Sequence, residues 1–318
     1  MGNNRKIPLL VVAGPTATGK TAVAVEVALG LNGEVVSADS MQIYRFMDIG
    51  TAKPTAQEMK GVPHHLIDIV YPDADFTVAV FQRLAREAIE NIYRCGRVPL
   101  LVGGTGFYID AVIYDYDFSG TGADEEFRKS LQEKAEQKGK KAVHEMLEEV
   151  DPVIASRIHV NDLKRTIRAL EIHRQTGDAG ALFRNNNKLA YPEYNILFIV
   201  LYYQRKKLYS RIEKRVDKMI DRGLVTEVQG LLDAGYHRNL VSMQGLGYKE
   251  IVGYLHHEYS LDEAVNLLKR NTRRFAKRQL TWFRRYSSIK WIDMEKYDTI
   301  NNVAEEIKYH MAELTRCR

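Results

Sequence analysis

The sequence is poor in cysteine and has no long apolar run. Its 318 residues include only Cys95 and Cys317, and neither has histidine partners at the spacing of a metal site. These two cysteines argue against a disulfide framework and against a zinc site, and they fit a reducing compartment. No apolar run approaches the roughly 20 residues that a membrane-spanning helix needs. The first residues, MGNNRKIPLL, lead into a predicted strand without the pattern of a signal peptide, so we expect a cytoplasmic enzyme with no membrane partner.

The composition is that of an ordinary globular protein. Apolar residues make up 45% and charged residues 27% of the chain, which indicates neither disorder nor membrane residence. The length allows two domains, or one large domain with an insertion. No repeat, low-complexity tract or obligate protein partner is indicated.

The positive charge is concentrated in one part of the chain. Residues 201–290 contain nineteen Lys and Arg against nine Asp and Glu, whereas the whole chain has a net charge of only +5. Such asymmetry favours a polyanionic partner that meets one face, with nucleic acid as the first candidate. A solvated basic surface without a partner is the alternative.

The stretch GPTATGKT has the spacing of a phosphate-binding P-loop. In this motif a glycine-bearing turn aims N–H groups at anionic oxygens, a lysine adds charge and a hydroxyl binds Mg²⁺. An apolar strand over 7–13 precedes the stretch and a helix over 21–33 follows, which places a helix N-terminus against the anion. Lys20 is the predicted charge and Thr21 the predicted metal ligand. The predicted site comprises Gly14, Pro15, Thr16, Ala17, Thr18, Gly19, Lys20 and Thr21.

Strands and helices alternate after this motif. Four further strands are predicted, over 34–40, 64–70, 97–104 and 194–203. An amphipathic helix is predicted to begin after Thr77 and to end near Gly96. The alternation predicts an α/β fold with a P-loop doubly wound parallel sheet, whose ligands lie beyond the carboxyl ends of the strands. The P-loop, Asp39 and residues 103–105 all fall at that edge.

Residues 116–191 have a different character. They are dense in charge and rich in helical patterns, so we predict a helical insertion domain there. The catalytic core would then consist of residues 1–115 and 192–318, with basic C-terminal helices. Insertions at such places often act as lids or as arms for a second substrate.

Two predicted helices carry most of the basic residues. The helix over 204–223 has a basic stripe beside its apolar face, which is either a solvated flank or a clamp for a diphosphate. The segment over 269–285 has eight basic residues, no acidic one and three aromatics. We interpret it as an RNA-tracking helix, with a membrane-surface helix as the weaker alternative. Three of its residues are predicted tRNA contacts: Arg273, Arg274 and Lys277.

Several reactions are compatible with a P-loop. It most often binds a nucleoside triphosphate, so a small-molecule kinase is one hypothesis, and a non-catalytic RNA-binding protein is another. The strand over 97–104, however, ends in glycines and lacks the aspartate that many P-loop enzymes use for magnesium. Asp39 is the strongest acidic candidate at the strand edge, although a lone aspartate at a strand end is more often a helix cap or a turn former than a catalyst.

Six blocks of the sequence together resemble one family. They are GPTATGKT, SADSMQIYRFMDIGTAKP, GVPHHLIDI, LVGGTGFY, HVNDLKRTIRALEI and AKRQLTWFRR. In this order they resemble the tRNA dimethylallyltransferases, or tRNA isopentenyltransferases, of the bacterial type, which lack a Cys/His finger. The resemblance implies transfer of the dimethylallyl group from dimethylallyl diphosphate to N6 of the adenine just 3′ of the anticodon, with diphosphate released. It also implies a need for Mg²⁺ and binding to the anticodon stem-loop of tRNA.

The resemblance assigns roles to individual residues. Asp39 matches the base at the acceptor nitrogen, Arg215 matches an arginine that binds diphosphate, and Thr105 matches a further contact in the catalytic site. The P-loop would hold the diphosphate of an allylic donor and not a triphosphate. The resemblance also implies a set of tRNA contacts: Asp39, Ser40, Met41, Gln42, Thr105, Arg128, Lys164, Arg165, Thr166, Ile167, Arg168, Gln244, Gly245, Leu246, Gly247, Tyr248 and Lys249.

The chemistry fits these roles. An adenine amine is a weak nucleophile, whereas an allylic carbon ionises readily once its leaving group is stabilised, so Lys20 and Arg215 should carry much of the rate. Asp39 would accept the N6 proton as the new bond forms. The adenine must leave its stack, which predicts a flipped base that enters a channel through the protein.

One stretch departs from the family pattern, and one close rival remains. Residues 176–188, TGDAGALFRNNNK, lack a proline and a serine that the family commonly has after the RALEI helix, so we assign them no role. The rival is an isopentenyltransferase that acts on free adenine nucleotides. The basic segment and the length of the insertion argue against it.

Overall fold

The computed structural model describes residues 6–114, 116, 118, 122–180 and 191–316. The chain forms two compact units, Met1–Ile113 with Tyr191–Arg318, and Tyr114–Ala190. The second unit thus begins two residues earlier, and ends one residue earlier, than the insertion over 116–191 that the sequence predicts. The Tyr191 N–H donates to the Ile113 carbonyl at 2.8 Å, so the chain leaves and re-enters the first unit at neighbouring points.

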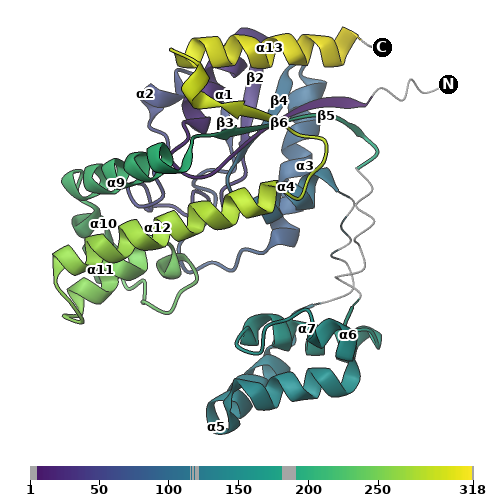
Figure 1. Cartoon of the computed structure of the whole chain (residues 1–318), viewed down its shortest axis with the longest axis vertical. Helices are drawn as coiled ribbons and strands as arrows, with labels where there is room; N and C mark the ends of the chain where they lie inside the picture. The colour runs from purple at the N-terminus through teal and green to yellow at the C-terminus, as the bar shows by residue number, and fades with distance from the viewer. Residues whose placement is uncertain (1–5, 115, 117, 119–121, 181–190, 317–318) are drawn as a thin grey trace. The chain divides into compact units, whose positions relative to one another are not determined.

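The first unit is built on a six-stranded sheet in which every pair of neighbouring strands is parallel (Figure 1). The strand order is β3-β2-β4-β1-β5-β6. The strands are β1 (Ile7–Ala13), β2 (Gly33–Ser37), β3 (His64–His65), β4 (Val98–Gly103), β5 (Tyr194–Tyr202) and β6 (Lys290–Asp293). This sheet confirms the predicted α/β class with a parallel sheet.

Helices cover the sheet and extend from it. In the first unit they are α1 (Lys20–Leu31), α2 (Ala56–Met59), α3 (Val78–Arg94), α4 (Gly106–Ile113), α9 (Arg205–Asp221), α10 (Leu224–Asp233), α11 (Tyr248–Leu255), α12 (Leu261–Phe283) and α13 (Ile300–Arg316), with 3-10 turns η1 (Ser242–Gln244) and η2 (Met294–Lys296). The Thr77 side chain caps α3 by accepting from the Val80 N–H, as the sequence predicts. The described residues contain no helix long and apolar enough to cross a membrane.

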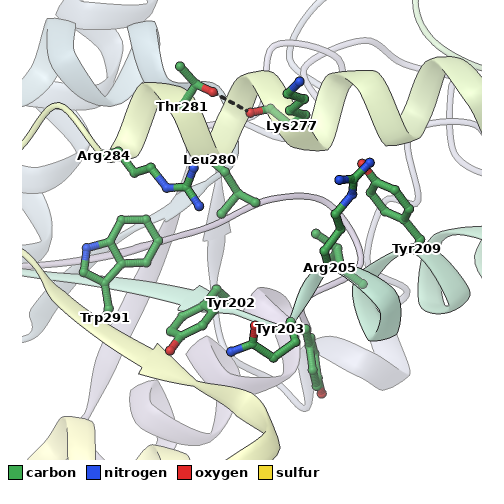
Figure 2. A pocket seen from close by; sticks show the side chains of 11 residues that line it. Tyr202, Tyr203, Arg205, Tyr209, Lys277, Leu280, Thr281, Arg284 and Trp291 are labelled. Atoms are coloured by element: carbon green, nitrogen blue, oxygen red, sulfur yellow. Dashed lines mark hydrogen bonds between the residues drawn. The ribbon is translucent and has the colours of Figure 1, made fainter.

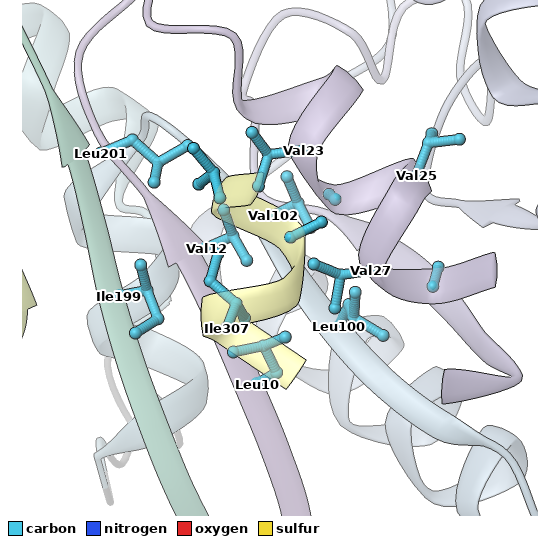
Figure 3. Close-up of a cluster of buried hydrophobic side chains, with 14 of the residues drawn as sticks. Leu10, Val12, Val23, Val25, Val27, Leu100, Val102, Ile199, Leu201 and Ile307 are labelled. Atoms are coloured by element: carbon cyan, nitrogen blue, oxygen red, sulfur yellow. The ribbon is translucent and has the colours of Figure 1, made fainter. Parts of the chain in front are cut away.

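The core explains why the central strands are apolar on both faces. In β1, Leu10 and Val12 belong to a buried cluster with α1 and α13, to which Ile307 also contributes (Figure 3). Successive side chains of a strand point to opposite faces, and Leu9 and Val11 are also wholly buried. A parallel sheet covered on both sides requires this continuous apolar pattern.

Two predicted strands are shorter in the structure. The strand expected over 64–70 ends at His65, because Leu66 and Asp68 have φ values of 62° and 56°, outside the β region. The strand expected over 34–40 ends at Ser37, before the turn that contains Asp39. Strand β6 and helix α13 are not among the predicted elements.

The second unit is helical, as predicted. It contains α5 (Glu125–Val150), α6 (Pro152–Ala155) and α7 (Leu163–Thr176) around its own apolar cluster, which includes Leu147 and Leu170. Each helix begins at an aspartate whose side chain accepts a backbone N–H: Asp124, Asp151 and Asp162. The stretch 176–188, to which no role was assigned, lies partly outside the described residues.

Candidate active site

The loop between β1 and α1 is held in one conformation by its own side chains. The buried Thr18 hydroxyl donates to the Pro15 carbonyl at 2.8 Å, and the Lys20 ammonium donates to the same oxygen at 2.9 Å. Gly14 has a φ of 147°, and a Cβ there would lie 2.4 Å from the Leu201 carbonyl oxygen. The first glycine of the motif is therefore required by close contact with β5.

The N-terminus of α1 is free to face an anion. Its N-cap, Gly19, has a left-handed conformation and makes no side-chain cap, and the first turn contains no acidic residue. Lys20 and Thr21 occupy the first two helical positions. The partial positive charge of the helix and its first N–H groups favour a phosphate here, and phosphate binding stays a prediction.

Gln279 of α12 joins this loop to the end of β4. Its side-chain oxygen accepts the Thr16 N–H at 3.0 Å, and its nitrogen donates to the Gly104 carbonyl at 2.8 Å. A Cβ at Gly104 would lie 2.3 Å from that nitrogen, so a larger residue there would displace the Gln279 side chain. Gln279 is not among the residues that the sequence predicts for the site. Its only signal was an uncharged amide within a strongly basic segment.

Asp39 follows β2 and shapes the turn that contains it. Its Oδ1 accepts the N–H of Met41 at 2.9 Å and that of Gln42 at 3.4 Å. Thr105, after β4, fixes the same turn, because its hydroxyl oxygen accepts the Ser40 N–H at 3.1 Å. The structure thus brings together Asp39, Ser40 and Thr105, which the sequence placed at one edge of the sheet.

Lys20, Arg215 and Asp39 act on one another electrostatically. Burial, together with the positive charge of Arg215, lowers the pKa of Lys20 from 10.5 to about 7, and Asp39 opposes this shift. Burial also lowers the pKa of Arg215, again against the effect of Asp39. Lys20 and Arg215 are thus two basic groups whose charges interact with each other and with Asp39, and such a pair suits a multiply charged anion.

Arg211, also of the basic stripe on α9, supports the loop from outside. Its Nε donates to the Ala17 carbonyl at 2.8 Å, and its guanidinium lies 4.5 Å from the centre of the Tyr203 ring. Ala17 has a φ of 65°, which is uncommon for a residue with a side chain. Arg211 stabilises this strained peptide.

The predicted tRNA-contact stretch 244–249 is partly internal. Gln244 and Lys249 are exposed, whereas Tyr248 is wholly buried and donates from its hydroxyl to Glu227 at 2.7 Å. Glu227 also accepts the backbone N–H groups of residues 48–50, at 2.7 to 3.0 Å. The expectation that Tyr248 contacts tRNA directly is therefore replaced by a supporting role, because its side chain is enclosed.

The basic face of α12 differs in one respect from the prediction. Arg274 and Lys277 are exposed, together with Arg278, as an RNA-tracking face requires. Arg273, by contrast, forms an ion pair with Glu213 of α9 at 2.5 Å. Arg273 therefore holds two helices together in addition to any contact with RNA.

In the second unit, too, some of the predicted tRNA-contact residues are exposed and others have partners inside the protein. Lys164 and Arg165 are exposed at the start of α7, and Thr166 and Ile167 are buried. The guanidinium of Arg128 forms hydrogen bonds of 2.9 and 3.0 Å with Glu171, which is fully buried and also binds Arg168. Arg128 and Arg168 therefore neutralise an internal carboxylate, and their contact with RNA stays a prediction.

The described residues contain no group of three or more His, Cys, Asp or Glu side chains that could hold a metal ion. Thr21 at the start of α1 offers one hydroxyl ligand, and a Mg²⁺ ion there would take its other ligands from substrate phosphate oxygens and water. The metal stays a prediction.

Comparisons with known proteins identify the family of the chain. The IPP transferase family model matches residues 42–286, and an isopentenyl transferase model matches residues 7–70. The chain is 55% identical to the tRNA dimethylallyltransferase of Desulforudis audaxviator, over 94% of this chain and 96% of that protein. It is 50% identical to that of Alkaliphilus oremlandii, over 93% and 95%.

Two solved structures of tRNA-prenylating enzymes also match this chain. The tRNA isopentenylpyrophosphate transferase of Bacillus halodurans is 45% identical to this chain, with a TM-score of 0.73 over 98% of this chain and 99% of that one. A eukaryotic dimethylallyltransferase, solved while acting on tRNA, is 29% identical, with a TM-score of 0.80 over 95% of this chain and 78% of that one.

Proposed function

The chain belongs to the IPP transferase family, that of the tRNA dimethylallyltransferases, and on this premise we propose that it prenylates tRNA. The reaction transfers the dimethylallyl group of dimethylallyl diphosphate to N6 of an adenine and releases diphosphate. The observation that carries the proposal is the electrostatic interaction of Lys20, at the N-terminus of α1, with both Arg215 and Asp39. It supports a site in which basic groups meet the leaving group and a carboxylate serves as the base for the nucleophile.

The cationic groups act on the leaving diphosphate. As the allylic C–O bond lengthens, negative charge grows on the diphosphate oxygens. Lys20, Arg215 and the first N–H groups of α1 meet this charge more strongly in the transition state than in the bound donor. Mg²⁺, held by the Thr21 hydroxyl and the phosphate oxygens, would supply further charge stabilisation.

Asp39 acts on the incoming amine. Its carboxylate accepts a hydrogen bond from the N6 amino group and takes the proton as the N–C bond forms. Because Oδ1 is held by the turn, the carboxylate keeps one orientation. Thr105 fixes that turn from β4 and so contributes to the position of Asp39.

We place the acceptor adenine in the anticodon loop, just 3′ of the anticodon. The exposed basic side chains Arg274, Lys277 and Arg278 support an RNA face on α12. The exposed Lys164 and Arg165 support a second RNA face on the helical unit. To reach Asp39 the adenine must be flipped out of its stack.

The decisive experiment compares acceptors and donors. The purified protein is incubated with dimethylallyl diphosphate, Mg²⁺ and unmodified tRNA, then with AMP in place of tRNA, and then with ATP and small alcohols. Mass analysis of digested products should find the dimethylallyl group on one adenosine of the tRNA only. Prenylated AMP would support the free-nucleotide enzyme, and phosphorylated alcohol would support a kinase.

A further inference from the structure

A cavity of about 560 Å³ lies beside the active site and has no part in the reaction described above. It is lined by the end of β5, the start of α9, the second half of α12 and β6 (Figure 2). Its volume falls in the range of small-molecule sites, which is about 300–1,000 Å³. The reacting groups Lys20, Asp39 and Thr105 do not line it.

The walls combine aromatic rings with positive charge. Four aromatic side chains line the cavity: Tyr202, Tyr203, Tyr209 and Trp291. Trp291 is 37% exposed, and its ring makes a T-shaped contact with Tyr202, with 5.7 Å between the ring centres. Flat apolar rings with open faces are the surfaces on which nucleobases stack.

Arginines stand on opposite sides of the cavity. Arg284 extends toward it from α12, and Arg205 of α9 lies beside the Tyr209 ring (Figure 2). No Asp or Glu lines the cavity, and the described part of the chain offers neither guanidinium an ion pair. Asp293 and Glu295 lie nearby, beside the Tyr202 hydroxyl and the Gln204 N–H respectively. The lining itself therefore favours an anion.

We infer that this cavity binds a nucleotide, with the base stacked on Trp291 and the tyrosines and the phosphate between Arg205 and Arg284. The ligand is either a nucleotide of the bound RNA or a free mononucleotide, since both present a base with a phosphate. The site is distinct from the donor site. The two share a wall, because Tyr203, Tyr209 and Leu280 also pack against the cluster that contains Ala17.

The test measures two affinities of the full chain. AMP is titrated by calorimetry into the wild-type protein and into the Lys20→Met variant, so that binding at the Gly14–Thr21 loop is recognised by its loss in that variant. The affinity for unmodified tRNA is measured in parallel. Trp291→Ala and Arg284→Gln are the test variants. Tyr309→Ala and Arg94→Gln are the matched controls, since both residues are exposed and lie on other helices.

Each test variant should weaken binding by roughly tenfold, which corresponds to the loss of one stacked base or one charged contact, and the controls should not. Weaker AMP binding identifies a free nucleotide as the ligand. Weaker tRNA binding in Trp291→Ala, which removes no charge from the basic segment over 269–285, identifies a nucleotide of the RNA. Unchanged affinities for both ligands in Trp291→Ala, together with unchanged AMP affinity in Arg284→Gln, would overturn the inference. If Trp291→Ala unfolds, the AMP affinity of Arg284→Gln decides the matter. The AMP measurement does not involve prenyl transfer, so its outcome is independent of the proposed function.

Discussion

At the scale of single residues, Asp39 has two tasks that one substitution can separate. Its Oδ1 holds the turn through the Met41 N–H, and its carboxylate is the proposed base. Asp39→Asn keeps an oxygen that can accept the turn hydrogen bond and removes the base. We expect kcat for prenyl transfer to fall about 10²–10⁴-fold in this variant, with little change in KM for tRNA. Asp39→Ala should lose both the turn hydrogen bond and the base. A normal kcat in Asp39→Asn would show that Asp39 is not the base.

Lys20 gives a prediction for pH. Because its pKa is lowered to about 7 in the free protein, its amine is mostly neutral at pH 8. A bound diphosphate favours the charged form, so the pKa rises on binding and the protein takes up a proton. Calorimetry at pH 8 in buffers of different ionisation enthalpy should detect this uptake, and Lys20→Arg should lack it because a guanidinium stays protonated. Equal proton uptake by the wild type and by Lys20→Arg would show that Lys20 is not the group that takes up the proton.

The same shift affects stability, and its sign can be stated. Between pH 7 and 10.5 the unfolded chain holds a proton on Lys20 that the folded chain has lost, so the contribution of Lys20 to stability rises with pH over this window. Lys20→Met should lack that rise and should be more stable than the wild type at pH 7. Denaturant unfolding at pH 7 and pH 9.5 measures how the unfolding free energy of each protein changes with pH. The same change in the wild type and in Lys20→Met would contradict this prediction.

At the scale of elements, Glu227 joins α10 to the loop after β2. It accepts three backbone N–H groups of residues 48–50 and the hydroxyl of Tyr248. Glu227→Ala leaves these donors without a partner and should cost about 3 kcal/mol of unfolding free energy. Glu227→Gln retains an acceptor oxygen and should cost less. Hydrogen exchange should locate the loss of protection at residues 48–50, and a stability equal to the wild type would contradict this role.

The basic face of α12 gives a prediction about salt. Arg274, Lys277 and Arg278 are exposed, so replacing all three by Gln should weaken tRNA binding and reduce the slope of log Kd against log salt by roughly 2. Arg273→Gln is the contrast, because that side chain is paired with Glu213. It should lower stability more than it lowers the salt slope. If the salt slope for tRNA binding is unchanged in the triple variant, the RNA does not bind to this face of α12.

How far the elements follow from the sequence depends on whether their signals are local. The bounds of β1 are predicted exactly as found, because a continuous apolar run bounded by a glycine turn is local information. The helix expected over 269–285 begins earlier, at Leu261, although Ser260 and Glu263 form a capping box that the sequence displays. Gln279 could not be predicted, because its partners are Thr16 and Gly104, far away along the chain.

At the scale of the whole molecule, the helical unit is an insertion whose two ends meet. The hydrogen bond between Tyr191 and Ile113 allows residues 114–190 to be replaced by a short Gly-Ser linker without separating β5 from the sheet. We expect this shortened chain to fold and to bind diphosphate, since the Gly14–Thr21 loop lies wholly in the first unit. It should bind tRNA much more weakly, because Lys164 and Arg165 are lost. Retention of full tRNA affinity would remove the second unit from RNA binding.

We expect this protein to accelerate prenyl transfer chiefly by stabilising the departing diphosphate. The most direct measurement is the single-turnover rate of transfer from dimethylallyl diphosphate to unmodified tRNA, in the wild type and in Arg215→Gln. If Arg215 meets the charge that grows in the transition state, the rate falls about 10²–10³-fold while the Kd for the donor changes far less. A rate equal to that of the wild type, or a loss confined to donor affinity, would contradict the account.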